Sequence, residues 1–264
     1  MFNMLTATLG GLIKDYRIKK RLSQLEVSLR IGWKDSTRLS KIEQGRVGKP
    51  TRKTVDKIIE ALGLTDQEKG EFLLTGSYLP TDKETDRAIR TVGEKILTWP
   101  YPAYLMDFSW RTLLINQPAI DIFKFPQELL RIVRKINFNV LGGAATKWPM
   151  EIFKGDDKDT LKPLDQTLVA QFKAEHLGKE NEKWYKHLVN SFMGDASFRK
   201  LWDTIDATDY HKKLYDYEYK LIKWPNGKII TYHIFDSKLV FDRRFIVVLY
   251  LQEKNSLKIT NTIN

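Results

Sequence analysis

Two short helical patterns separated by a single glycine lie between Ser23 and Gly45, and this spacing constrains the fold more than any other feature of the chain. Ser23 is placed to cap the first helix. Gly32 then supplies the left-handed or tightly bent residue that few other side chains tolerate. The first helix is expected to bury three apolar side chains, Val27, Leu29 and Ile31.

The second helix of this pair is expected to open near Asp35 or Ser36, bury Leu39 and Ile42, and stop at Gly45. All of its outward positions carry hydrogen-bonding side chains: Ser36, Thr37, Arg38, Lys41 and Gln44. Such a face suits a polar, anionic partner. The alternative is an ordinary helical hairpin whose polar face meets only water.

The distribution of charge argues against that alternative. Residues 1–64 carry 14 Lys and Arg against 6 Asp and Glu, a local charge of +8 out of a total of +11. The remaining 200 residues carry 30 against 27 and are nearly balanced. A basic excess on one small helical unit indicates a nucleic-acid phosphate backbone as the partner.

The N-terminal segment resembles the lambda-repressor/Cro-like, or XRE-type, helix-turn-helix family over about residues 8–64. The resemblance rests on the opening Leu9-x-x-Leu-Ile-x-x-x-Arg17, on Ser23-Gln24 and Gly32, on Leu39-Ser-x-Ile-Glu-x-Gly45, and on Val55-x-x-Ile-Ile-x-Ala-Leu62. The segment Gly32–Ser36 is one residue longer than the family's usual turn. The register of the base-reading residues therefore stays open.

The resemblance implies a role for each polar position, with double-stranded DNA as the partner. Gln24 would hold a phosphate at a helix N-terminus. The base-reading residues would be Ser36, Thr37, Arg38 and Lys41, although Ser36 could serve only as an N-cap and Arg38 only as a solvated or phosphate-contacting side chain. Arg17 and Glu43 would form a structural ion pair. Flexible cations around the helix ends are expected to contact phosphates: Lys34, Arg46, Lys49 and Arg52.

Capping boxes and breaks divide the chain into four parts. The helical domain is expected to span residues 1–76, and a capping box at Thr65–Glu68 begins its last helix. A second capping box, at Thr81–Glu84, begins the helix that follows this domain. Residues 77–99 read as a connector helix, 100–254 as a second domain and 255–264 as a flexible tail. The connector, with Ile89, Val92 and Ile96 on one side, is a candidate contact of a homodimer; alternatively, it packs within its own chain.

The second domain begins and ends with strands. Residues 103–108 and 111–115 read as strands, Asn116 starts a helix through Phe123, and helices are expected at 126–141, 162–176, 180–193 and 196–204. Strands are expected at 215–223, 229–235 and 244–252, with a turn at Pro225-Asn-Gly227. The fold class is therefore an all-α helix-turn-helix bundle joined by a connector helix to an α+β domain with an antiparallel sheet.

Residues 100–252 resemble the MmyB-like ligand-binding domain, which has a PAS-like fold and often follows an XRE-type head. The resemblance rests on Pro102–Asp107 followed by Trp110 and Asn116, on Phe198-Arg-x-Leu-Trp202, and on the terminal hairpin. It implies an apolar cavity for a fatty-acid-like or other small hydrophobic ligand. The expected lining residues are Tyr104, Met106, Leu113, Ile115, Phe123, Phe198, Trp202, Phe235 and Val247; each could instead be core.

Other classes of protein find little support in the sequence. Cysteine is absent, no run approaches 18 apolar residues, and no signal peptide is evident, so we expect a chain without membrane association in the bacterial cytoplasm, at the nucleoid. The four histidines, His176, His187, His211 and His233, lack metal-ligand spacing. No phosphate-cradling or nucleophile-elbow motif occurs. We therefore expect no metal, no cofactor and no catalysis.

The sequence predicts a DNA-binding transcription regulator whose second domain senses a small hydrophobic ligand. The alternative is a phage or toxin–antitoxin type DNA-binding protein whose second domain binds another protein and no small molecule. A closed apolar cavity of ligand size would favour the first hypothesis, and a solid core with an exposed apolar patch would favour the second.

Overall fold

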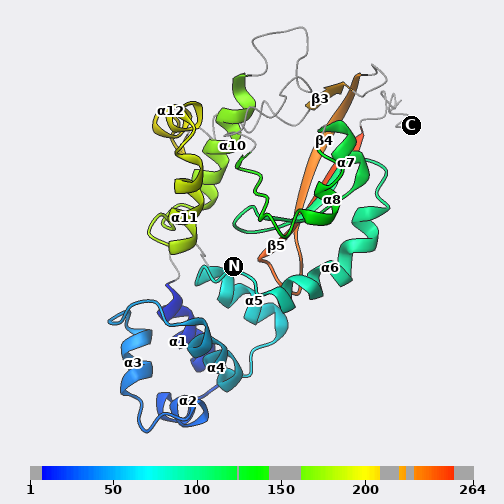
Figure 1. The fold of residues 1–264 in the computed structure, drawn as a ribbon. Helices are drawn as coiled ribbons and strands as arrows, with labels where there is room; N and C mark the ends of the chain where they lie inside the picture. Colours follow the sequence, from blue (N-terminus) through cyan, green and yellow to red (C-terminus); the bar gives the residue numbers. More distant parts are fainter. Residues whose placement is uncertain (1–7, 124, 143–161, 209–219, 224–228, 253–264) are drawn as a thin grey trace, which may run out of the picture. The chain divides into compact units, whose positions relative to one another are not determined.

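The computed structural model describes residues 8–123, 125–142, 162–208, 220–223 and 229–252 (Figure 1). The chain divides into two compact units. Unit 1 comprises residues 1–80 together with 238–245, and unit 2 comprises 81–237 and 246–264. No helix in the described part of the chain is long and apolar enough to cross a membrane.

Unit 1 is built from five helices among its described residues: α1 (Leu9–Lys19), α2 (Gln24–Ile31), α3 (Thr37–Glu43), α4 (Arg52–Leu62) and α5 (Asp66–Thr75). Side-chain caps define their starts. Ser23 and Thr65 each form a capping box with the glutamate three residues later. Gly32 ends α2 with φ 88°, a left-handed conformation that favours glycine.

The core of unit 1 gathers one apolar stripe from each helix. Ile13, Val27, Leu39 and Ile58 are completely buried. The expectation that Leu29 joins them is wrong: its side chain is 57% exposed, because Leu29 lies two residues from both Val27 and Ile31 and so points away from the buried face of the helix. The backbone of α1 at Gly10 lies so close to α3 that an added Cβ would stand 2.3 Å from the Ile42 carbonyl oxygen.

The boundary of unit 1 differs from the expected end at Gly76. Ser77, with φ 53°, takes the left-handed position after α5, and the N–H groups of Ser77 and Tyr78 donate to the carbonyls of Leu74 and Leu73. Gly76 is needed for another reason, since an added Cβ would stand 2.5 Å from the Tyr78 ring. The unit continues to Pro80 and also includes residues 238–245.

Unit 2 combines helices with one sheet. Its described helices are α6 (Asp82–Leu97), α7 (Gln117–Ile122), α8 (Leu129–Ile132), α10 (Lys162–Glu175), α11 (Lys183–Phe192) and α12 (Ala196–Thr204). Its strands are β1 (Ala103–Asp107), β2 (Thr112–Ile115), β3 (Lys220–Lys223), β4 (Ile229–Lys238) and β5 (Phe245–Gln252).

The five strands form a single sheet in the order β2-β1-β5-β4-β3. The β1–β2 and β3–β4 pairs are antiparallel, with Tyr104 opposite Ile115 and Ile222 opposite Ile230. The alternation in β5 places Ile246, Val248 and Tyr250 in the main core. The sheet brings strands from both ends of the domain together, and helices α7 to α12 lie between them in the sequence.

Two expectations for unit 2 need correction. The expected helix at 126–141 is reduced to the single turn of α8, and turns follow it. The expected connector at 77–99 is divided between the units: residues 77–80 belong to unit 1, and α6 belongs to unit 2, where it packs on β1 and β2 and Ile96 is 1% exposed. The turn at 225–227, the tail at 255–264 and His211 lie outside the described residues.

Candidate nucleic-acid interface

The sequence pattern did not decide whether Asp35 or Ser36 caps the start of helix α3. The Asp35 carboxylate accepts a hydrogen bond from the Thr37 N–H at 2.7 Å, whereas the Ser36 side chain makes no capping bond. This bond lowers the pKa of the Asp35 carboxyl below its ordinary value. Because Asp35 caps the helix, the half-buried Ser36 hydroxyl is not required for that task.

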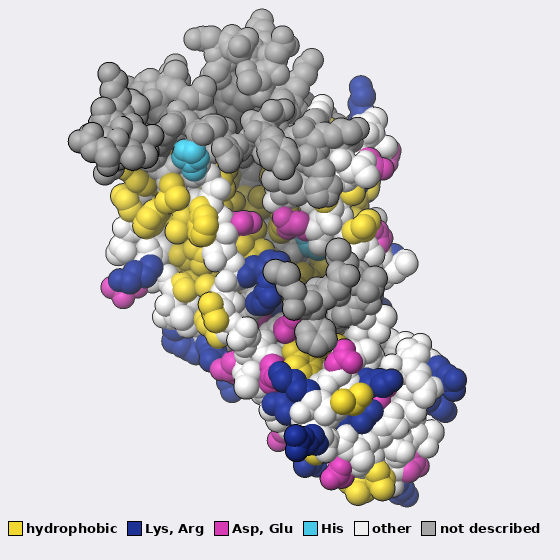
Figure 2. Space-filling view, turned by 180° about the vertical axis from the view of Figure 1, so that it is seen from behind, with side chains coloured by type: hydrophobic (Ala, Val, Ile, Leu, Met, Phe, Trp, Pro, Cys, Tyr) yellow, Lys and Arg dark blue, Asp and Glu magenta, His cyan; other side chains and the backbone are white. Residues whose placement is uncertain are grey.

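The outward face of α3 is polar and exposed. Thr37, Arg38, Lys41 and Gln44 are all exposed, and Leu39 and Ile42 on the opposite side are buried. The Arg38 guanidinium lies 4.7 Å from the centre of the Trp33 ring, an arrangement that steadies this cation beside the helix. The space-filling view shows further Lys and Arg side chains on the surface of unit 1 (Figure 2).

A buried carboxylate ties α3 to the two preceding helices. Arg17 Nε and Nη2 donate to the two Glu43 oxygens at 2.6 and 2.9 Å, and the Gln24 amide donates to Glu43 Oε2 at 2.8 Å. Side-chain exposure is 12% for Arg17 and 2% for Glu43. The hydrogen bond to Glu43 raises the pKa of Arg17. The expected pair is therefore formed, and it includes Gln24.

The expected phosphate contacts fall into two groups. Lys34 and Arg46 are exposed on the surface. Lys49 and Arg52 are held within unit 1, because Lys49 Nζ donates to the Ser77 carbonyl at 3.1 Å and Arg52 Nη1 donates to the Leu79 carbonyl at 3.3 Å. Gln24 stands at the first position of α2, and its side-chain amide is engaged by Glu43 as well.

The comparisons with known proteins bear on this unit. Residues 8–72 match a family described as a helix-turn-helix domain. No curated protein matches the chain. The match and the geometry of α2, Gly32 and α3 show that the N-terminal part of the chain is a helix-turn-helix DNA-binding domain.

The nine expected lining residues of unit 2 lie in several environments. Met106, Leu113, Ile115 and Phe198 are buried. Tyr104, Phe123, Trp202 and Val247 are half-buried, and Phe235 is 51% exposed. Six of the nine pack in two apolar clusters of the described residues and are accounted for as core: Tyr104, Met106, Ile115, Phe123, Phe198 and Trp202.

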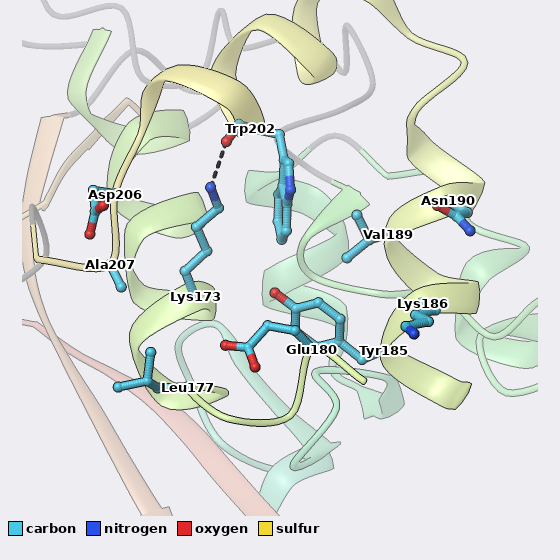
Figure 3. A pocket seen from close by; sticks show the side chains of 10 residues that line it. All are labelled: Lys173, Leu177, Glu180, Tyr185, Lys186, Val189, Asn190, Trp202, Asp206 and Ala207. Atoms are coloured by element: carbon cyan, nitrogen blue, oxygen red, sulfur yellow. Dashed lines mark hydrogen bonds between the residues drawn. The ribbon is translucent and has the colours of Figure 1, made fainter. Parts of the chain in front are cut away.

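A pocket of about 410 Å³ lies among α10, α11, α12 and the residues that follow them (Figure 3). Trp202 is the one expected residue that lines it. Tyr185, Leu177 and Val189 add apolar surface, and Lys173 donates from within the pocket to the Trp202 and Ile205 carbonyls. Burial lowers the pKa of Lys173, against the opposing effects of Asp206 and Asp203.

His176 is the one buried histidine in the described part of the chain. Its Nδ1 lies 2.7 Å from the Phe172 carbonyl oxygen and its Nε2 lies 2.6 Å from the Phe108 carbonyl oxygen. Burial lowers its pKa, whereas the two carbonyls favour the proton. Through these two contacts His176 links the end of α10 to the β1–β2 turn.

Proposed function

We propose that this protein is a sequence-specific transcription regulator that acts at the bacterial nucleoid in the cytoplasm. The observation that carries the proposal is the exposed face of α3, on which Thr37, Arg38 and Lys41 point outward. The helix is held in place by the hydrogen bonds that its buried Glu43 accepts from Arg17 and Gln24. A rigid helix with outward donors is what major-groove reading requires. Ser36 stays in the reading set because Asp35 takes over the cap.

Binding titrations on the preferred duplex and on a scrambled duplex test this assignment. The preferred sequence is first selected from random duplexes with the wild-type protein. Lys41→Ala should lose about 1–3 kcal/mol on the preferred duplex and much less on the scrambled one, since base contacts carry the discrimination. Arg46→Ala is the matched control and should weaken both complexes about equally, as a phosphate contact does. Equal losses for Lys41→Ala would remove it from the reading set.

We also propose that unit 2 has a PAS-like fold of the MmyB-like kind and binds a small apolar ligand with a carboxylate, without catalysis. The pocket among α10, α11 and α12 is open to solvent and is not the closed cavity that would favour a ligand most. It supports the proposal because Trp202, Val189 and the exposed Leu177 offer apolar surface and Lys186 offers a cation at its edge. Glu180 and Asp206 also line it and restrict where a carboxylate can lie. Its volume is within the range of small-molecule sites.

Thermal unfolding with added dodecanoate tests the ligand proposal. A ligand that binds only the folded chain raises the unfolding temperature in a concentration-dependent manner. Leu177→Trp should abolish the rise by filling the pocket, and it should fold because Leu177 is 73% exposed. Dodecanol, which lacks the carboxylate of dodecanoate, is the uncharged probe for comparison. A rise that is unchanged in Leu177→Trp would place the ligand elsewhere.

A further inference from the structure

A segment far from the helix-turn-helix match belongs to the same compact unit. Residues 238–245 connect β4 to β5, yet they are part of unit 1. Gly70 of α5 allows their close approach, because a Cβ at Gly70 would stand 2.8 Å from the Asp242 Cα. The family match at residues 8–72 includes neither this segment nor the turn at 77–79.

Arg244 links this segment to the turn that follows α5. It is completely buried, and its Nε and Nη2 donate to the two Asp242 carboxylate oxygens at 3.0 and 2.6 Å. Its Nη1 donates to the Tyr78 carbonyl at 3.2 Å. A buried guanidinium persists only where its charge and its N–H groups are satisfied. Arg244 thus holds the Tyr78 backbone in one place.

The turn that Arg244 holds is also the support of two expected phosphate contacts. The successive carbonyls of residues 77, 78 and 79 accept hydrogen bonds from three cationic side chains, which are Lys49, Arg244 and Arg52 in that order. Two of these cations flank Thr51, the cap of α4. One turn therefore helps to position both side chains at the start of that helix, and Arg52 Nε donates in addition to Asp56 Oδ1 at 2.9 Å.

The Tyr78 side chain strengthens the same connection. Its hydroxyl donates to the Pro50 carbonyl, and Lys49 Nζ lies 4.5 Å from the centre of its ring. Tyr78 is 7% exposed. The backbone that carries Lys49 and the backbone that accepts from Arg244 are thus joined through one buried residue.

We propose that Arg244 is a positioning residue for DNA binding: by holding the 77–79 turn, it fixes the positions of Lys49 and Arg52 at the start of α4, where both are expected to contact phosphates. The proposal rests on the DNA-binding function proposed above. Arg244 is completely buried and acts on DNA only through the turn. The DNA-binding unit accordingly depends on a residue more than 160 positions downstream of the turn it holds.

The test is duplex binding by the full chain as a function of salt. Arg244→Gln should weaken binding about tenfold near physiological salt and reduce the salt slope by about one to two, because poorly placed cations release fewer counterions. In a Lys49→Ala/Arg52→Ala background, the same substitution should change affinity less than about twofold, since the side chains it orients are gone. Arg243→Gln removes the same charge one residue away and should leave the slope in place.

The outcomes separate the two proposals. Wild-type protein that shows no salt-dependent duplex binding would overturn the proposed function together with this inference. Wild-type binding with an unchanged slope in Arg244→Gln would overturn this inference alone. A loss of equal size in both backgrounds, or an equal effect of Arg243→Gln, would also do so. If Arg244→Gln fails to fold, Arg244→Lys is used instead, because it keeps the positive charge but lacks the planar guanidinium. The salt slope of duplex binding by Arg244→Lys must then fall between the slopes of wild type and Lys49→Ala/Arg52→Ala.

Discussion

At the scale of single residues, the DNA-binding unit depends on buried charges that are fully paired. Glu43 accepts from Arg17 and Gln24, and Arg17 also donates to the Leu22 carbonyl. A carboxylate with 2% exposure is stable there only because three donor groups meet it. The consequence is a fixed orientation of α3 relative to α1 and α2.

Removing one partner of this pair should therefore be costly. Arg17→Ala or Glu43→Ala is expected to reduce the free energy of unfolding by about 3 kcal/mol, since the remaining charge is stranded in the interior. Urea unfolding followed by circular dichroism, with hydrogen exchange to locate the loss in α1 and α3, measures this. Arg134→Ala is the control, because the Arg134 and Asp86 side chains are 39% and 47% exposed and such exposed pairs contribute little. Equal effects at both sites would contradict the role of burial.

At the scale of elements, single polar side chains join helices to strands. Asn116 is fully buried: its Oδ1 accepts from the N–H groups of Ala103 and Ala119, and its Nδ2 donates to the carbonyls of Ile96, Trp99 and Tyr101. One side chain thereby caps α7, accepts from the first residue of β1 and donates to a carbonyl in the last turn of α6. This explains structurally why an asparagine stands at that position of the sequence motif.

Asn116→Ala should destabilise unit 2 by about 3 kcal/mol or more, as it removes a helix cap and leaves several buried backbone groups unpaired. Asn116→Asp keeps the two acceptor bonds that cap α7 but places a carboxylate oxygen against the buried carbonyls of Ile96, Trp99 and Tyr101, so its loss of stability should come from the junction and not from the cap. Exposed Asn190→Ala is the control. Thermal unfolding of the three variants decides; a loss below about 1 kcal/mol for Asn116→Ala would mean that the cap alone matters.

The junction between α1 and α5 makes stability depend on pH. Partial burial raises the pKa of Glu68, but the Thr65 N–H and the contacts with Lys19 and Lys20 outweigh it and lower the pKa to about 2. Since this folded value lies below the ordinary 4.5, the stabilisation is complete above pH 4.5 and is lost as the pH falls through about 2. Glu68→Gln should flatten urea-unfolding stability between these values; an unchanged pH dependence would assign it to other carboxyls.

At the scale of the whole molecule, specificity requires more than one recognition helix. On the proposal that α3 reads base edges, one helix covers only a few base pairs, and helix-turn-helix regulators commonly bind as two-fold dimers on half-sites about 34 Å apart. Of the expected contacts on α6, Ile96 is buried within its own chain and Ile89 and Val92 are half-buried. Leu97 at the end of the same helix is 52% exposed.

We expect the intact chain to sediment as a dimer through unit 2, and Leu97→Glu to shift it toward monomer. Leu29→Glu, at 57% exposure on α2, is the matched control in unit 1 and should leave the dimer intact. Analytical ultracentrifugation over a range of concentrations measures both. Dissociation by Leu29→Glu and none by Leu97→Glu would move the interface to the DNA-binding unit.

Much of the local structure of this protein could be predicted from its sequence, because caps, glycines and apolar periodicity act over a few residues. The capping boxes at Ser23, Thr65 and Thr81, the left-handed Gly32 and the helix at Asn116 all follow from that chemistry. That Lys49 and Arg52 are held within unit 1 follows instead from tertiary contacts, since both donate to the 77–79 turn. Arg244 and the 77–79 turn meet through contacts between segments that no local pattern links. Likewise, the sequence does not distinguish core residues of unit 2 from residues that line a pocket, because burial depends on neighbours that are distant in sequence.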